Sequence, residues 1–510
     1  MKFERTKNAK RNIVYGLLNR FLSLVLPFTN RTVFIYVLGV EYLGLNTLFA
    51  SILQMLSLAE LGIGRAIVYH MYKPIAKNNT DMVCALLCLY RRIYRLIGTT
   101  IFFLGIIIMP FLSHLISGNI PDGINLYIVY FVYLINTVIS YWFFIYKASI
   151  INAMQRADII SNIASATQIF QCLIQICLLY LTHNYYAYLI IMPFATLFNN
   201  ILLSYCTERM FPQYKCRGKV SISVLRDLKE KVLGLLIQNF CVTTRNGLDS
   251  ICLSYFIGLS ITGIFNNYFY VLTAITSICA IFTSGITAIV GNSMVTYDSE
   301  KNYQDMRRLN TLYMFFSGAC SIFMLIFYQP FMRLWVGDSM MLPMDVVILF
   351  VLYFYILKMG DVRSVYVGGA GLWWENRYRS IVETLSNLIL NVVFVMYFGV
   401  YGILLATIVS LFFINFLWGS HIVFHHYFRN GKVWEYFLDH GKYFAVFSIS
   451  AWISWEVSLV ELSSPILSII YKLLSSSLVI CLSYYLLYRK SYVCHESIQW
   501  FMDKMGMSRR

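Results

Sequence analysis

The chain has 510 residues, of which 59% are hydrophobic and 13% are charged; its mean hydropathy is +0.66 and its formal net charge is +16. A soluble globular protein of this composition would expose far more apolar surface than one core can bury. The composition therefore excludes a soluble globular protein and indicates that much of this chain has lipid as its solvent.

Apolar runs of about 20 residues, the length that crosses a bilayer core as a helix, recur along the chain. These runs are continuously apolar and lack the period-two alternation of membrane β-barrel strands. We predict an all-α integral membrane protein of about 14 transmembrane helices. The predicted spans are residues 13–38, 45–72, 96–116, 124–146, 159–181, 186–205, 232–257, 262–290, 311–328, 346–367, 381–398, 402–424, 444–460 and 466–488.

The basic residues are distributed unequally between the two sets of connections. The tails and the connections on their side of the membrane carry 32 Lys and Arg, and the alternate connections carry one, Arg333. The positive-inside rule then places both termini in the cytoplasm and the protein in the cytoplasmic (inner) membrane. Orientation and attraction to anionic lipid explain the basic excess, so no nucleic-acid partner is expected. No small-residue cleavage site follows the basic N-terminus, and we expect the first span to be retained.

An internal repeat divides the chain. Gly39 and Gly44 follow the first span, and Gly258 and Gly263 follow the seventh at an offset of 219 residues. Parallel repeats of six spans surround a central cavity and exchange between inward-open and outward-open states. The predicted parts are an N-terminal six-helix lobe (1–205), a cytoplasmic basic connection (206–231), a C-terminal six-helix lobe (232–428), helices 13 and 14 (429–488) and a cytoplasmic tail (489–510).

Charged side chains inside the spans are the candidate functional residues, because such groups are costly in lipid and normally face a cavity or each other. The first, second, seventh and tenth spans carry Arg20, Arg31, Glu60, Arg65, Arg245, Asp249, Lys358, Asp361 and Arg363. The cations outnumber the anions, which predicts a cavity for an anionic cargo. A pyrophosphate fits, since guanidinium groups bind phosphate oxygens bidentately.

We therefore assign Arg20, Arg31, Arg65 and Arg245 to pyrophosphate binding. Arg20 and Arg31 lie eleven residues apart and so share one helix face. Lys358 and Arg363 supply further positive charge to the cavity.

Structural alternatives exist for several of these residues. Arg245 and Asp249 have the i,i+4 spacing of a simple ion pair, Asp361 could form an internal network with Lys358 and Arg363, and Arg65 could extend to the interface.

The carboxylates within the spans are also the candidates for coupling transport to an ion gradient. Glu60, Asp249 and Asp361 are the carboxylates that could couple transport to a proton or sodium gradient. We predict no catalytic residue, metal site or bound cofactor. His421, His425 and His426 include an i,i+4 pair, but no carboxylate or cysteine joins them, and we interpret them as interfacial polar residues.

Several segments resemble the oligosaccharide flippases of bacterial O-antigen, capsule and exopolysaccharide assembly, within the multidrug/oligosaccharidyl-lipid/polysaccharide exporter superfamily. They are residues 5–13 (RTKNAKRNI), 38–46 (LGVEYLGLN), 56–64 (LSLAELGIG), 71–76 (MYKPIA) and 334–337 (LWVG). The resemblance implies two six-helix lobes, alternating access and an undecaprenyl-pyrophosphate-linked oligosaccharide as cargo. It also implies membrane lipids and polysaccharide polymerase or assembly proteins as partners, and cationic residues on the spans that carry Arg20, Arg31, Arg65 and Arg245.

Two other functions remain open. A multidrug or cation exporter of the same superfamily would carry cationic, aromatic substrates, for which a carboxylate-rich cavity is expected, so the cationic excess argues against it. A membrane polysaccharide polymerase or glycosyltransferase would have a sizeable exoplasmic loop, whereas the predicted outer connections are short. A secondary transporter rather than an enzyme is therefore expected.

Overall fold

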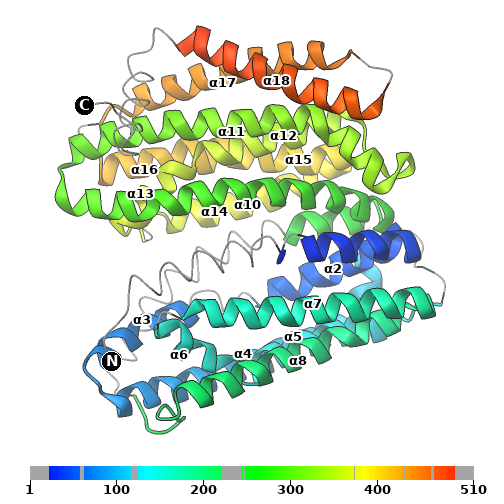
Figure 1. Cartoon of the computed structure of the whole chain (residues 1–510), viewed down its shortest axis with the longest axis vertical. Helices are drawn as coiled ribbons and strands as arrows, with labels where there is room; N and C mark the ends of the chain where they lie inside the picture. The colour runs from blue at the N-terminus through cyan, green and yellow to red at the C-terminus, as the bar shows by residue number, and fades with distance from the viewer. Residues whose placement is uncertain are drawn as a thin grey trace. The chain divides into compact units, whose positions relative to one another are not determined.

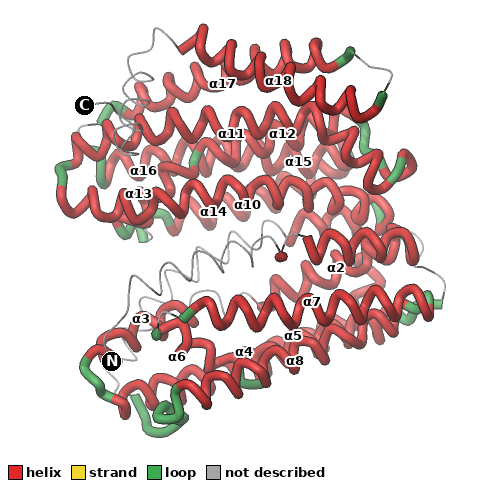
Figure 2. The backbone as a smooth tube through the Cα atoms, in the orientation of Figure 1, coloured by secondary structure: helices red, strands yellow, loops and turns green. Residues whose placement is uncertain are grey.

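The computed structural model describes residues 22–23, 25–57, 63–116, 121, 123–154, 156–220, 244, 247–372, 374–429, 431–460 and 464–488. Within these residues every regular element is a helix (Figure 2). The predicted all-α class is confirmed.

Eight of the described helices are long and apolar enough to cross a membrane, or nine if the bent pair Leu126–Trp142 and Ile145–Ala153 forms one span. Two shorter apolar helices, Val25–Leu38 and Val40–Leu56, precede them. The chain is thus a multi-pass membrane protein. The eight spans are Thr80–Leu115, Asp158–Thr182, Tyr185–Met210, Leu259–Ser284, Ser299–Val336, Arg377–Phe398, Val400–His426 and Leu467–Leu486.

The chain forms two compact units, Met1–Gly263 and Ile264–Arg510. In the first unit, α4 packs on α5, α5 on α8, and α8 on α7 (Figure 1). After the helix Val25–Leu38, the elements of this unit are α2 (Val40–Leu56), α3 (Ile63–Ala76), α4 (Thr80–Ile108), η2 (Met109–Leu115), α5 (Leu126–Trp142), η3 (Ile145–Lys147), α6 (Ala148–Ala153), α7 (Ala157–Thr182) and α8 (Tyr185–Met210).

Asparagine caps begin three of these helices. The side chains of Asn79, Asn125 and Asn184 accept hydrogen bonds from backbone N–H groups in the first turns of α4, α5 and α8. Such caps satisfy donors that the helix itself leaves without partners. The path from α5 to α6 bends at Phe144, whose φ is 60°.

In the second unit, α11 packs on α12 and α17, α14 on α15, and α17 on α18 (Figure 1). One helix, α10 (Leu259–Thr296), begins in the first unit and continues into the second. The following elements are α11 (Ser299–Val336), η4 (Asp338–Met340), α12 (Met344–Met359), α13 (Asp361–Ala370), α14 (Arg377–Phe398), α15 (Val400–Ser410), the π-helix η5 (Leu411–Trp418), α16 (Gly419–His426), α17 (Val433–Ser458) and α18 (Pro465–Tyr488).

The repeat seen in the sequence recurs in the backbone. Gly39 directly precedes α2 with a φ of 101°, and Gly258 directly precedes α10 with a φ of 120°. Glycine reaches positive φ without the steric cost of a Cβ. The two glycines at an offset of 219 residues therefore make the same kind of turn into the next helix.

The second glycine of each pair, Gly44 or Gly263, packs against the first residue of the helix that follows the other pair's first glycine. A Cβ on Gly44 would lie 2.2 Å from the backbone oxygen of Leu259, and one on Gly263 would lie 2.5 Å from the backbone oxygen of Val40. All four residues belong to the first unit. Val40 and Leu259 are related by the same offset, so the contact between α2 and α10 is reciprocal, as glycine permits where helices approach closely.

Three helix boundaries differ from the prediction. α4, α11 and α17 begin at Thr80, Ser299 and Val433, well before their apolar runs, because hydropathy marks the lipid-embedded part of a helix and backbone hydrogen bonding continues beyond it. Of the span predicted at 45–72, the structure describes residues 45–57 and 63–72, of which 45–56 belong to α2 and 63–72 to α3.

The lobe limits stay a prediction. The sequence assigns residues 232–257 to the C-terminal lobe, whereas their described residues, 244 and 247–257, belong by their contacts to Met1–Gly263. For example, the hydroxyl of Ser254 donates to the carbonyl of Leu115 over 3.0 Å.

Candidate functional site

Five of the nine predicted charged residues have described side chains. Arg20, Glu60 and Arg245 lie outside the described residues, and so does the side chain of Arg65 in α3. The Arg245–Asp249 pair therefore stays a prediction. The described residues are Arg31, Asp249, Lys358, Asp361 and Arg363.

Lys358 and Asp361 form an ion pair at the junction of α12 and α13. Lys358 Nζ donates to Asp361 Oδ2 over 2.8 Å, and the hydroxyl of Tyr313 on α11 donates to the same oxygen over 2.5 Å. Lys358 is buried, with 4% of its surface exposed. The internal-network alternative is thus correct for this pair, and a neighbouring carboxylate balances the Lys358 charge.

Arg363 turns to a different partner. Its Nη1 donates to the backbone carbonyl of Asn415 over 2.5 Å, and its Nη2 donates to Asn415 Oδ1 over 3.1 Å. Asn415 lies within η5, and π-helical segments are rare and concentrate at functional or strained positions. Asn415 in turn donates to Glu383 Oε2 over 3.0 Å, and Arg379 donates to that oxygen over 2.5 Å. Asn415 therefore connects the buried Arg363 guanidinium to the Glu383 carboxylate, with which the buried Arg379 forms an ion pair.

The remaining two residues lie in the first unit. Asp249 is buried. Arg31 is half-buried on the helix Val25–Leu38. Its neighbour Asn30 donates from Nδ2 to Gln175 Oε1 over 2.9 Å and to the Tyr188 hydroxyl over 3.1 Å. These bonds join the helix that carries Arg31 to α7 and α8.

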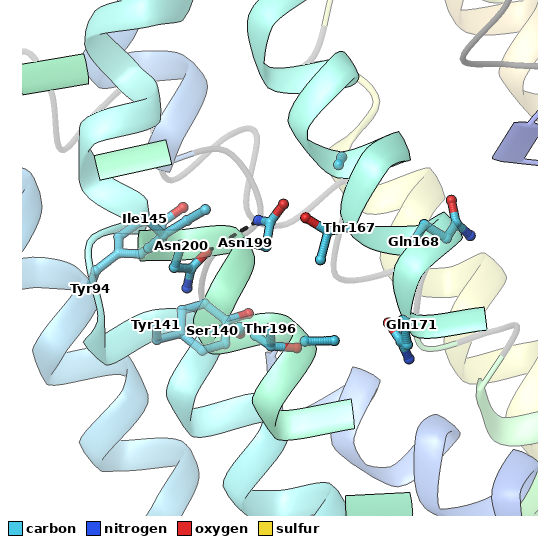
Figure 3. A pocket seen from close by; sticks show the side chains of 12 residues that line it. Tyr94, Ser140, Tyr141, Ile145, Thr167, Gln168, Gln171, Thr196, Asn199 and Asn200 are labelled. Atoms are coloured by element: carbon cyan, nitrogen blue, oxygen red, sulfur yellow. Dashed lines mark hydrogen bonds between the residues drawn. The ribbon is translucent and has the colours of Figure 1, made fainter. Parts of the chain in front are cut away.

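A polar cavity of about 490 Å³ lies in the first unit among α4, α5, α7 and α8 (Figure 3). Its volume falls in the range of small-molecule sites, roughly 300–1,000 Å³. It is lined by Tyr94, Ser140, Tyr141, Ile145, Ala164, Thr167, Gln168, Gln171, Ala195, Thr196, Asn199 and Asn200. These lining residues include no acidic or basic side chain, so the five described charged candidates all lie outside the cavity lining.

Helical spacing groups several of these polar side chains on one face of α7 and on one face of α8. Gln168 and Gln171 are three residues apart on α7, and Thr196 and Asn200 are four apart on α8. Residues at these spacings share one face of a helix. Because α7 packs directly on α8, the two faces border one space.

Two amides in the cavity have unused hydrogen-bonding capacity. Asn200 is 2% exposed, and its Oδ1 accepts from Asn199 Nδ2 over 3.4 Å, but its Nδ2 has no partner among the described residues. Gln168 makes no hydrogen bond to any residue that the structure describes. The cavity can therefore offer donors and acceptors to an uncharged polar ligand, and its lining holds no charge to balance an ion.

The sequence prediction missed this cavity because it considered only charged residues. A signal was present: Gln168, Gln171 and Gln175 are spaced by three and four residues inside an apolar run. Amides in a membrane span normally form hydrogen bonds within the bundle or face a cavity. What the sequence could not indicate was that α4, α5 and α8 would supply the other walls of the cavity.

No protein-family model and no curated protein matches the sequence. Solved structures do match by fold. The lipid II flippase MurJ in an inward closed conformation matches with a TM-score of 0.66 at 14% identity, covering 94% of this chain and 99% of that one. A multidrug resistance MATE family transporter of the MOP superfamily, in its inward-facing conformation, matches with a TM-score of 0.60 at 15% identity, covering 78% of this chain and 94% of that one.

A Vibrio cholerae MATE transporter matches with a TM-score of 0.56 at 13% identity, covering 85% of this chain and 99% of that one. These likenesses extend over nearly the full length of each neighbour. The chain thus has the membrane fold shared by the MATE transporters of the MOP superfamily and the lipid II flippase MurJ.

Proposed function

We propose that this chain is a flippase that moves undecaprenyl-pyrophosphate-linked oligosaccharides from the inner to the outer leaflet of the cytoplasmic membrane by alternating access. One observation carries the proposal: the first unit, which contains membrane spans, has an open cavity lined by uncharged, mostly polar side chains. A glycan that leaves water loses the hydrogen bonds of its hydroxyl groups, and this loss is costly unless the protein replaces them. Amides and hydroxyls supply both donors and acceptors for that exchange.

The pyrophosphate of the cargo needs positive charge near the same route. Arg31 supports this role because it lies on the helix that Asn30 joins to Gln175, one helical turn from the cavity residue Gln171. We extend the assignment to Arg20, Arg65 and Arg245 from their positions in the sequence. Lys358 and Arg363 contribute less to the proposal, since Asp361 and Asn415 already engage them.

The cavity chemistry favours a glycan over a cationic drug. A buried cation requires a carboxylate or a comparable counter-charge, and the lining residues include none. Two of the fold neighbours named above are MATE transporters, so drug export remains the competing function that an experiment must exclude.

The proposal includes topology, driving force and partners. Both termini lie in the cytoplasm, as the basic residues indicate. Glu60, Asp249 and Asp361 are the candidates for coupling to a proton or sodium gradient. Polysaccharide polymerase or assembly proteins would receive the cargo at the outer leaflet.

Two measurements test the function. Depletion of the protein in its native cell should cause a lipid-linked oligosaccharide to accumulate in the inner leaflet. In proteoliposomes, the purified protein should expose undecaprenyl-pyrophosphate-linked oligosaccharide from that cell to an external glycosidase. If cargo exposure matches that of protein-free liposomes while a fluorescent cationic drug is exported, the flippase assignment is wrong and drug export replaces it.

A further inference from the structure

We infer that the cavity among α4, α5, α7 and α8 is a subsite for the uncharged sugar rings of the cargo, with Gln168 and Asn200 as its recognition residues. The inference rests on the proposed function and deepens it. It assigns the glycan to a place inside the first unit, apart from the arginines assigned to the pyrophosphate.

The first argument is the unsatisfied amide of Asn200. A buried donor without a partner costs about 1–3 kcal/mol, and Asn200 Nδ2 is such a donor among the described residues. Figure 3 shows Asn200 beside Asn199 at the cavity wall formed by α8. A ligand hydroxyl that accepts from Nδ2 would remove this cost.

The second argument is the composition of the facing wall. Gln168 lines the cavity from α7 with an amide that no described residue engages. An amide offers two donor hydrogens and one acceptor oxygen, and a sugar hydroxyl can donate and accept. Two lining amides with unused capacity, one on α7 and one on α8, thus match a ligand that carries several hydroxyls.

The third argument concerns two aromatic side chains of the lining. Tyr94 and Tyr141 both line the cavity, and their ring centroids lie 5.7 Å apart at an interplanar angle of 48°. A tyrosine combines an apolar ring with a polar hydroxyl. Such side chains are complementary to a sugar, because the ring can pack on the apolar C–H face and the hydroxyl can bond to the polar edge.

The cavity is also connected to the helix that carries Arg31. Gln171 donates to Gln175 Oε1 over 3.4 Å, and Asn30 donates to the same oxygen. Four residues of helix rise by about 6 Å. This row of amides places the sugar subsite within a short distance of the residue to which the pyrophosphate is assigned.

Binding of two lipids to the full-length protein tests the inference. The probes are undecaprenyl pyrophosphate and the same lipid carrying one uncharged hexose, each titrated in detergent against wild type, Gln168→Leu and Asn200→Leu. Gln304→Leu, an exposed position on α11, is the matched control. Gln168 makes no hydrogen bond to any residue that the structure describes, so Gln168→Leu should fold normally. The test therefore remains valid if Asn200→Leu is unstable.

We expect wild type and Gln304→Leu to bind the hexose-bearing lipid more tightly than the bare lipid. Each cavity variant should lose about 5–10-fold in affinity for the hexose-bearing lipid, the loss of roughly one hydrogen bond, and bind the bare lipid as wild type does. If wild type prefers the hexose-bearing lipid and both variants keep that preference, the subsite is wrong and the flippase assignment stands. If wild type binds neither lipid, the proposed function fails, and the subsite fails with it.

Discussion

Asn30 donates a hydrogen bond to Gln175 over 2.9 Å, linking the helix Val25–Leu38 to α7 across 145 residues of sequence. Gln175 is 1% exposed, and its Nε2 donates to the carbonyl of Tyr188 over 3.1 Å. One buried amide therefore holds three helices together and sets the position of the segment that carries Arg31.

Replacement of Gln175 by leucine should destabilise the first unit. The change leaves the Asn30 amide and the Tyr188 carbonyl with fewer partners, which should lower the free energy of unfolding by about 1–3 kcal/mol. Thermal unfolding in detergent measures this loss. The exposed Gln304→Leu should change stability by less than about 0.5 kcal/mol, and equal effects of the two variants would contradict the bridging role of Gln175.

Replacement of Gly44 by alanine should force α2 away from α10. The added Cβ would lie 2.2 Å from the backbone oxygen of Leu259, and overpacking of this kind costs about 1–3 kcal/mol. Gly441→Ala on α17 is the control, because nothing lies within 4 Å of its added Cβ. A Gly44→Ala protein with the unfolding temperature of the control would show that the close approach does not matter for stability.

Replacement of Asp361 by asparagine should destabilise the second unit strongly. Lys358 would keep its charge while buried and would lose its carboxylate partner, a change that costs about 3–5 kcal/mol in buried pairs. The double variant Lys358→Met with Asp361→Leu should recover most of that loss. Glu456→Gln, an exposed carboxylate on α17, should have little effect.

The same Asp361 variant bears on energy coupling. A folded Asp361→Asn protein that still responds to proton and sodium gradients as wild type does would remove Asp361 from the coupling candidates. Its bonds to Lys358 and Tyr313 would then have a structural role only.

Replacement of Arg363 by lysine should destabilise η5. Lysine cannot bridge the carbonyl and the side chain of Asn415 as the planar guanidinium does. Loss of these charge-assisted bonds should cost about 1.5–3 kcal/mol. The control is Arg333→Lys, in an exposed ion pair with Asp338 that contributes about 0–1 kcal/mol. Unfolding in denaturant should separate the two variants clearly.

Replacement of Arg31 by glutamine should reduce flipping without unfolding the protein. Under the proposed function its guanidinium binds the pyrophosphate, and charge-assisted hydrogen bonds of about 1.5–3 kcal/mol correspond to roughly 10–100-fold in rate or affinity. The proteoliposome assay measures the rate, with Arg333→Gln as the control. Normal flipping by Arg31→Gln would exclude Arg31 from cargo binding.

The amino-acid sequence by itself determined the class of the molecule. Whether a segment crosses lipid depends on the summed hydrophobicity of neighbouring residues, so all predicted spans except the seventh correspond to described helices. The sequence also identified Gly39 and Gly258 as corresponding positions of the repeat, and in the structure both have a positive φ, which glycine reaches without the steric cost of a Cβ.

Only the tertiary structure decided which polar groups meet. Sequence spacing suggested Lys358, Asp361 and Arg363 as one network, yet Arg363 bonds to Asn415, 52 residues further along the chain. The uncharged cavity brings Tyr94, Ser140, Gln168 and Asn200 together from four helices. Helix packing determines such meetings, and packing depends on the shapes of whole faces rather than on any local pattern of residues.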